Sequence, residues 1–316
     1  MQTVFDAPVD RDLVDRSLAT TKLGSMWLDD IARPDYPRLT GPVSADLLVV
    51  GAGYTGLWTA LHAAERDPGR RIVLIDSHRV GWAASGRNGG FVEASLTHGA
   101  ANGKARWPDE YDRLAELGQA NLDGMQADIT RLGLDVDWER TGTLSVATEP
   151  HQVAWLREAA ADGEGEFLGL TEIRDEVHSP TYLAGLFARE SCAIVHPAKL
   201  AVELARACTA AGVRIYEHSP ARRVESGGAA LRVPAGDGVV TAHQAVLATN
   251  VFPSLLRRNR WHTVPVYDYV LATEPLTEAQ LDRIGWRGRQ GISDCGNQFH
   301  YYRLTADNRI VWGGYD

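Results

Sequence analysis

Cysteine is scarce in this chain, with only three in 316 residues. They are Cys192, Cys208 and Cys295, and no two of them form a C-x-x-C pair. The small, odd number argues against a disulfide framework, and the spacing argues against a zinc site. The ten histidines are scattered and no H-E-x-x-H pattern occurs, so the sequence predicts no metal site.

Excess positive charge is also absent. The chain has 32 Lys and Arg against 41 Asp and Glu, a net charge of −9, which argues against a nucleic-acid partner. Acidic residues at positions 6, 10, 12 and 15 interrupt the region where a secretory leader would be apolar, so we expect no signal peptide. Together with the few cysteines, this favours a cytoplasmic protein.

Long apolar runs are missing except for Leu47 to Ala64, which carries no formal charge. Three glycines at a regular spacing interrupt it, which favours a buried strand that turns into a helix over a membrane span. The glycines form Gly51-Ala-Gly53-Tyr-Thr-Gly56, between an apolar strand and a predicted helix. This context predicts a dinucleotide-binding turn, with phosphates at the helix N-terminus.

A second predicted strand, Arg71 to Ile75, ends on Asp76. A carboxylate at this position suits the hydroxyls of an adenosine ribose and repels a 2′-phosphate, so NADP is disfavoured. The turn and the acid alone leave NAD and FAD open. A second glycine-rich segment, Ala84 to Gly90, follows, and the two segments together favour a flavin over a nicotinamide cofactor.

The remaining pattern predicts an α/β fold. Helices are expected at 107–132, 151–161, 171–177 and 197–211, and further strands at 143–147, 182–188, 213–216, 223–225, 239–249, 267–273, 298–303 and 309–313. Residues 1–43 hold several prolines and read as an arm on the surface, with Ser25 to Asp29 as the segment that docks it.

Several phrases carry a family resemblance: Val80 to Gly90, His196 to Leu200, Leu247 to Asn250, and Tyr301 to Arg309. They resemble the D-amino-acid oxidase-like FAD-dependent oxidoreductases, and within them the γ-glutamylputrescine oxidase group. The resemblance implies a discontinuous, Rossmann-like FAD-binding domain and a mixed α+β substrate domain. We expect the arm at 1–43, the FAD-binding domain at 44–136 and 190–256, and the substrate domain at 137–189 and 257–316.

The resemblance also implies roles for individual residues. The implied FAD-binding set comprises Gly51, Ala52, Gly53, Tyr54, Thr55, Gly56, Asp76, Ser77, Ala84, Ser85, Arg87, Asn88, Gly89, Gly90, Val224, Ala248 and Thr249. In it, Val224 would meet the adenine through its backbone. The implied substrate-binding set is Arg303, Tyr301 and Tyr302, with the Arg303 guanidinium suited to a substrate carboxylate.

Relatives in this family continue beyond the strand with which this sequence ends, and their last segment adds a glycine-rich turn facing the flavin. The resemblance therefore implies a substrate domain that is C-terminally incomplete. We expect this chain to keep the adenosine site better than the flavin site. A truncated, catalytically incompetent nucleotide-binding chain is the alternative to an active enzyme.

The expected activity is oxidation of the C–N bond of an amine or amino acid by hydride transfer to flavin N5, giving an imine that water hydrolyses. Because the flavin carries the difficult step, no protein base is assigned. A nicotinamide-dependent dehydrogenase is a weaker option, since the segment Ser85 to Gly90 suits a flavin better. The identity of the amine, the electron acceptor and the oligomeric state stay open.

Overall fold

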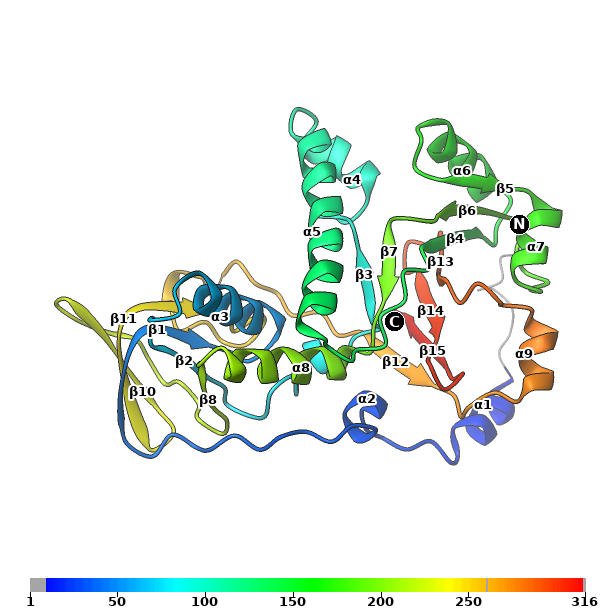
Figure 1. Ribbon diagram of the computed structural model, residues 1–316. Helices are drawn as coiled ribbons and strands as arrows, with labels where there is room; N and C mark the ends of the chain where they lie inside the picture. The colour runs from blue at the N-terminus through cyan, green and yellow to red at the C-terminus, as the bar shows by residue number, and fades with distance from the viewer. Residues whose placement is uncertain (1–9, 260, 315–316) are drawn as a thin grey trace.

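The computed structural model of the chain describes residues 10–259 and 261–314 (Figure 1). Two β-sheets form two lobes, and an upright helix, α5 (Tyr111–Leu132), stands between them. The first sheet takes its strands from residues 42–75 and 214–247, and the second from residues 143–188 and 269–314. Each sheet therefore combines segments that lie far apart in the sequence.

The first sheet has six strands in the order β8-β2-β1-β11-β10-β9. Its strands are β1 (Pro42–Val50), β2 (Ile72–Ile75), β8 (Arg214–Tyr216), β9 (Glu225–Gly227), β10 (Ala230–Ala235) and β11 (Gly238–Leu247). The first four in the sheet order are parallel, whereas β10 and β9 pair antiparallel. Two helices, α3 (Tyr54–Arg66) and α8 (Pro197–Ala210), pack against each other beside this sheet.

Both faces of β1 are buried, as its apolar run predicts for a central parallel strand. Leu47 and Val49 belong to the cluster that contains α3 and α8 residues, whereas Leu48 and Val50 belong to a cluster on the other face. The β1–α3–β2 unit has the strand, turn and helix order that the glycine spacing predicts, and the α/β class is confirmed.

The second sheet has seven strands in the order β12-β15-β14-β13-β4-β6-β5. Its strands are β4 (Thr143–Ala147), β5 (Glu166–Leu168), β6 (Ala184–Ala188), β12 (Tyr269–Ala272), β13 (Gly291–Asp294), β14 (His300–Leu304) and β15 (Ile310–Gly314). Only β13 and β4 pair in parallel. Three helices accompany it: α6 (Gln152–Ala161), α7 (Leu170–Glu176) and α9 (Glu278–Ile284).

A short ribbon connects the lobes, made of β3 (Phe91–Glu93) and β7 (Cys192–Ile194). The helix α4 (Ala100–Arg106) follows β3 and leads to α5. Short 3₁₀ turns, η2 (Ala84–Gly86) and η3 (Arg257–Asn259), complete the described elements. Among the helices of residues 10–259 and 261–314, we find none with the length and apolar character that a membrane crossing requires.

The N-terminal arm runs under both lobes through α1 (Arg11–Leu18) and α2 (Met26–Asp29). No α1 residue is buried, but Trp27 and Leu28 of α2 are, in a cluster with Ala198 of α8 and Val311 of β15. Because α8 belongs to the first lobe and β15 to the second, the arm contacts both. The segment predicted to dock the arm is thus confirmed.

Candidate functional site

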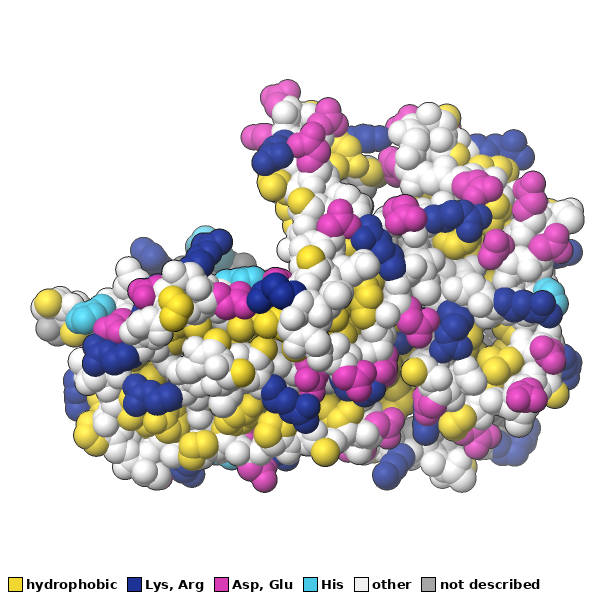
Figure 2. All heavy atoms as spheres, viewed as in Figure 1, with side chains coloured by type: hydrophobic (Ala, Val, Ile, Leu, Met, Phe, Trp, Pro, Cys, Tyr) yellow, Lys and Arg dark blue, Asp and Glu magenta, His cyan; other side chains and the backbone are white. Residues whose placement is uncertain are grey.

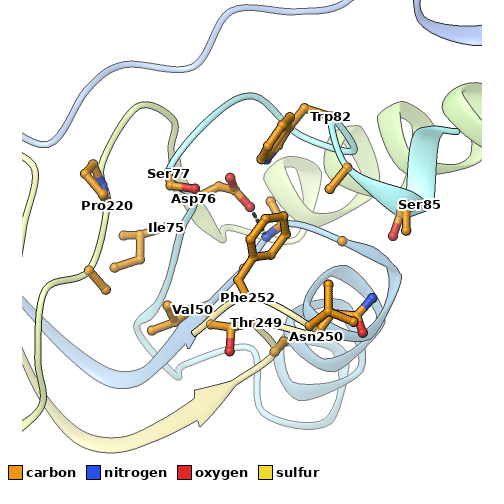
Figure 3. A pocket seen from close by; sticks show the side chains of 18 of the residues that line it. Val50, Ile75, Asp76, Ser77, Trp82, Ser85, Pro220, Thr249, Asn250 and Phe252 are labelled. Carbon is orange, nitrogen blue, oxygen red and sulfur yellow. Dashed lines mark hydrogen bonds between the residues drawn. The ribbon is translucent and has the colours of Figure 1, made fainter. Parts of the chain in front are cut away.

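A cavity of about 220 Å³ lies at the carboxyl ends of β1, β2 and β11 (Figure 3). Ligands of parallel α/β sheets bind at this edge. The chain segments that leave the strands form the lining: Val50–Gly53, Ile75–Ser77, Gly81–Ser85, Ser219–Ala221, Ala248–Pro253 and Leu255. We call this space cavity 1.

The turn from β1 to α3 needs its glycines for steric reasons. Gly51 has φ +111°, and a Cβ there would lie 2.4 Å from the carbonyl oxygen of Ala248. A Cβ on Gly56 would lie 1.9 Å from the carbonyl oxygen of Gly51. The helix begins directly after Gly53, which lines cavity 1, and a helix N-terminus favours an anionic phosphate.

Asp76 joins this turn to the end of β2. Its carboxylate accepts a hydrogen bond from the backbone N–H of Ala52 at 2.7 Å and another from that of His78 at 2.8 Å. Figure 3 shows the side chain at the edge of cavity 1, below Trp82. A carboxylate has about four acceptor positions, so two remain for ribose hydroxyls.

The second glycine-rich segment lies against the first. The hydroxyl of Ser85 accepts from the backbone N–H of Tyr54 at 3.1 Å, and a Cβ on Gly53 would lie 2.9 Å from that hydroxyl. Asn88 holds the segment's own turn, because its amide nitrogen donates to the carbonyl of Ala84 and its amide oxygen accepts from the N–H of Gly90. Both glycine-rich segments thus form one continuous backbone surface.

A larger cavity, of about 910 Å³, lies at the far end of the second segment, and we call it cavity 2. Its walls come from the segments 88–100, 111–115 and 293–301 together with β4 and β6. Figure 2 shows the molecule hollowed between the α4–α5 helices and the α6 lobe. Ala84 and Ser85 line cavity 1 and Asn88 and Gly89 line cavity 2, so one short segment connects the two.

Tyr301 of β14 stands in the wall of cavity 2. Its ring packs edge-on against Phe91, with the centroids 5.7 Å apart, and its hydroxyl donates to Asp268. A Cβ on Gly89 would lie 2.5 Å from the ring. Tyr301 therefore lies beside the second glycine-rich segment, whereas its contact with substrate stays a prediction.

Arg303 and Tyr302 lie elsewhere and line neither cavity 1 nor cavity 2. The Arg303 side chain is 2% exposed, and its guanidinium donates to the carbonyls of Val195 and Leu304 and stacks 5.5 Å from the ring of Trp27. Burial lowers its pKa to about 10. These contacts favour a structural role between the lobes, so the geometry gives no support for carboxylate binding by Arg303.

Tyr302 points to the opposite face of β14, as strand alternation requires. Its hydroxyl is hydrogen-bonded to that of Tyr182 at 2.6 Å, and its ring stacks on Trp312 at 4.2 Å. Burial raises the pKa of Tyr182 to about 12. Tyr302 is therefore a core residue of the second lobe.

The residues predicted to bind cofactor divide among three cavities. Nine of them line cavity 1: Gly51, Ala52, Gly53, Asp76, Ser77, Ala84, Ser85, Ala248 and Thr249. Tyr54, Asn88 and Gly89 line cavity 2. A third cavity lies beside α5, and Tyr54, Thr55 and Asn88 line it. Four line none of the three: Gly56, Arg87, Gly90 and Val224.

The sequence reasoning missed other parts of the lining of cavity 1. Pro220 and Ala221, which follow β8, lie in the wall in place of Val224. Trp82 and Phe252 also line cavity 1, and their rings pack against each other at a tilt, with centroids 5.7 Å apart. Since β8 is parallel to β2, its carboxyl end could have been placed at this edge from the strand order alone.

Cavity 2 has an acidic lining: the described residues that line it include Glu93, Glu164 and Asp294 but no lysine or arginine. Two of these carboxylates have basic partners: Glu164 pairs with Lys104 at 3.0 Å, and Asp294 with His300 at 2.7 Å. Within the described ranges, no group of three or more His, Cys, Asp or Glu residues could hold a metal ion.

Comparison with known proteins gives consistent results. Residues 46–316 match a family model described as DAO, FAD dependent oxidoreductase. The γ-glutamylputrescine oxidoreductase of Escherichia coli is 33% identical over 294 residues, and the probable oxidoreductase OrdL of Haemophilus influenzae is 30% identical over 293. Each match covers 88% of this chain and 66% of the relative, so the chain spans about two thirds of these relatives.

Solved structures show the same fold at low sequence identity. The glycine oxidase of Geobacillus kaustophilus superposes with a TM-score of 0.68 at 17% identity, covering 86% of this chain and 71% of that one. This similarity concerns the fold, and the sequence matches carry the family relationship.

Proposed function

The chain belongs to the DAO family of FAD-dependent oxidoreductases, and on that premise we propose that it holds FAD across cavities 1 and 2 and oxidises the C–N bond of an amine or amino acid. The observation that carries the proposal is the segment Ala84 to Gly89, which lines cavity 1 at one end and cavity 2 at the other. A nucleotide that binds in cavity 1 would extend along the backbone of this segment into cavity 2.

The residues of cavity 1 fit the nucleotide half of FAD. Gly51 and Gly53 line the cavity, and the N-terminus of α3, which begins directly after Gly53, offers N–H groups to a pyrophosphate. Asp76 presents a carboxylate to the ribose hydroxyls. We propose that these groups hold the adenosine and pyrophosphate.

The second segment fits the flavin half, because Asn88 and Gly89 line cavity 2 and Gly89 places no side chain beside the ring of Tyr301. When bound there, FAD supplies the acceptor for the hydride that leaves the substrate carbon. The walls of cavity 2 would orient the neutral amine and exclude water around it, and water would hydrolyse the imine after release. No side chain is assigned as a base.

The domain division expected from the sequence is retained as a proposal, with FAD-binding segments 44–136 and 190–256 and substrate segments 137–189 and 257–316. It is supported by the two sheets, whose strands fall into these segments. The small-molecule partner is proposed to be an amine or amino acid.

Anaerobic reduction tests the activity. Purified protein is loaded with FAD, and the flavin absorbance is recorded while a panel of amines and amino acids is added. We expect at least one amine to bleach the oxidised flavin band, because hydride transfer needs no oxygen. Stoichiometric FAD without bleaching by any member would favour the alternative, a nucleotide-binding chain without turnover.

A further inference from the structure

Glu93 faces cavity 2 from the centre of the molecule. It is the last residue of β3, and side chains alternate along a strand, so Phe91 and Glu93 share one face while Val92 lies on the other. The cavity linings agree for Glu93 and Val92, because Glu93 lines cavity 2 and Val92 lines the cavity beside α5, whereas Phe91 lines both. Two residues along a strand span about 7 Å, so Glu93 lies about 7 Å from Phe91 along β3.

Glu93 has no hydrogen-bond or ion-pair partner among the residues that the structure describes. The other two carboxylates of the lining are each paired with a basic group, Lys104 or His300. His98 is the one basic side chain in the described lining of cavity 2, and its effect on Glu93 is only a long-range one. The carboxylate thus brings an uncompensated negative charge into the cavity.

The position of Glu93 makes this charge costly. Its side chain is exposed to the cavity, but protein surrounds it otherwise, and this burial raises the pKa of the carboxyl group, while His98 offsets part of the rise. A carboxylate in such surroundings gains more from a cationic partner than one on an open surface, because fewer water molecules compete for it.

From this geometry we propose that the substrate carries a second positive charge, which Glu93 binds through its carboxylate while the reacting amine lies beside Gly89 and Tyr301. The substrate class is then an alkyl diamine rather than a monoamine. A substrate carboxylate would find no lysine or arginine in the described lining, which disfavours a simple amino acid. This inference rests on the proposed function in one respect only, namely that the reacting amine lies beside Gly89 and Tyr301.

Direct binding tests the cation site without turnover. 1,5-Diaminopentane and pentylamine differ by one terminal ammonium group, and each is titrated calorimetrically into the FAD-loaded protein at neutral pH. We expect the diamine to bind about tenfold or more tightly, as a charge-assisted hydrogen bond allows. In Glu93→Gln, which keeps the side-chain size, this ratio should fall toward one.

Glu164→Gln is the matched control, because Glu164 lines the same cavity but is already paired with Lys104. It should retain the preference for the diamine. Equal affinity for the two ligands, no detectable binding of either, or a preference unchanged in Glu93→Gln would overturn the proposal. Circular dichroism confirms that each variant is folded.

The two proposals fail separately. A diamine preference that depends on Glu93, without flavin reduction by any amine, would refute the oxidoreductase activity and leave the cation site. Flavin reduction with equal KM values for the diamine and the monoamine would support the oxidoreductase activity and refute the cation site. If both proposals hold, Glu93→Gln raises KM for the diamine more than KM for pentylamine.

Discussion

His196 should make the stability of this protein sensitive to acid. It precedes α8 as the N-cap residue, and its Nδ1 accepts a hydrogen bond from the backbone N–H of Lys199 at 3.1 Å. The ring packs edge-on against Trp27 at 4.6 Å and is only 7% exposed. Protonation of Nδ1 would remove the acceptor that caps the helix and would place a charge in these surroundings.

Burial lowers the pKa of His196 from 6.5 to about 4. A lowered folded-state pKa means that the unfolded chain binds the proton first, so the stability is fully present above pH 6.5 and is lost as the pH falls from there toward 4. The linkage relation gives a loss of about 2 kcal/mol at about pH 5 and a limit of about 3 kcal/mol at lower pH.

The matched variant is His196→Asn, because asparagine caps a helix equally well and does not titrate in this range. Urea denaturation at about pH 7.5 and about pH 5 measures the free energy of unfolding of both proteins. We expect the wild-type protein to lose about 2 kcal/mol more than the variant on acidification. Equal losses would show that His196 is not a buried neutral cap and would refute this reasoning.

Further variants test three other parts of the structure. In urea denaturation, Gly56→Ala should lower the free energy of unfolding by more than about 2 kcal/mol, because its Cβ would lie 1.9 Å from a backbone oxygen. Gly124→Ala is the control: a Cβ there would meet nothing within 4 Å, so it should raise the free energy of unfolding by about 0.5–1 kcal/mol. Tyr302→Phe should cost about 1–2 kcal/mol, and adding Tyr182→Phe should cost little more, since no buried hydroxyl is then left unpaired. Arg303→Met should cost about 1–3 kcal/mol and leave the ligand preference of cavity 2 unchanged in calorimetry, which a role in substrate binding would contradict.

Much of the first lobe could be predicted from the sequence because its signals are local. The glycine spacing, the apolar β1 and the acid after β2 each constrain a few neighbouring residues, and α3 begins within one residue of the expected start. The long helix α5 begins at Tyr111 rather than Trp107, because Pro108 disfavours a helical backbone at Trp107, whose φ of −136° and ψ of 59° lie outside the helical region.

Long-range relations were harder to predict. Short strands such as β3, β7 and β13 have no periodicity of their own and depend on partners far along the chain. Alternation placed Tyr301 and Arg303 on one face of β14, but it could not tell that Val195 and Trp27 enclose the guanidinium. The sequence did not indicate Glu93 as a binding residue for the same reason, because the wall of cavity 2 that contains it is assembled from several segments.

A competition experiment on nucleotide binding tests the central claim most directly, that cavity 1 holds the adenosine half of FAD against Asp76. The purified chain is saturated with FAD, and displacement is followed by flavin fluorescence as ADP or adenosine 2′,5′-bisphosphate is added. The account predicts stoichiometric FAD, displacement by ADP, and much weaker displacement by the 2′-phosphate, because the Asp76 carboxylate repels it. Failure to take up FAD, or equal displacement by the two nucleotides, would contradict the account.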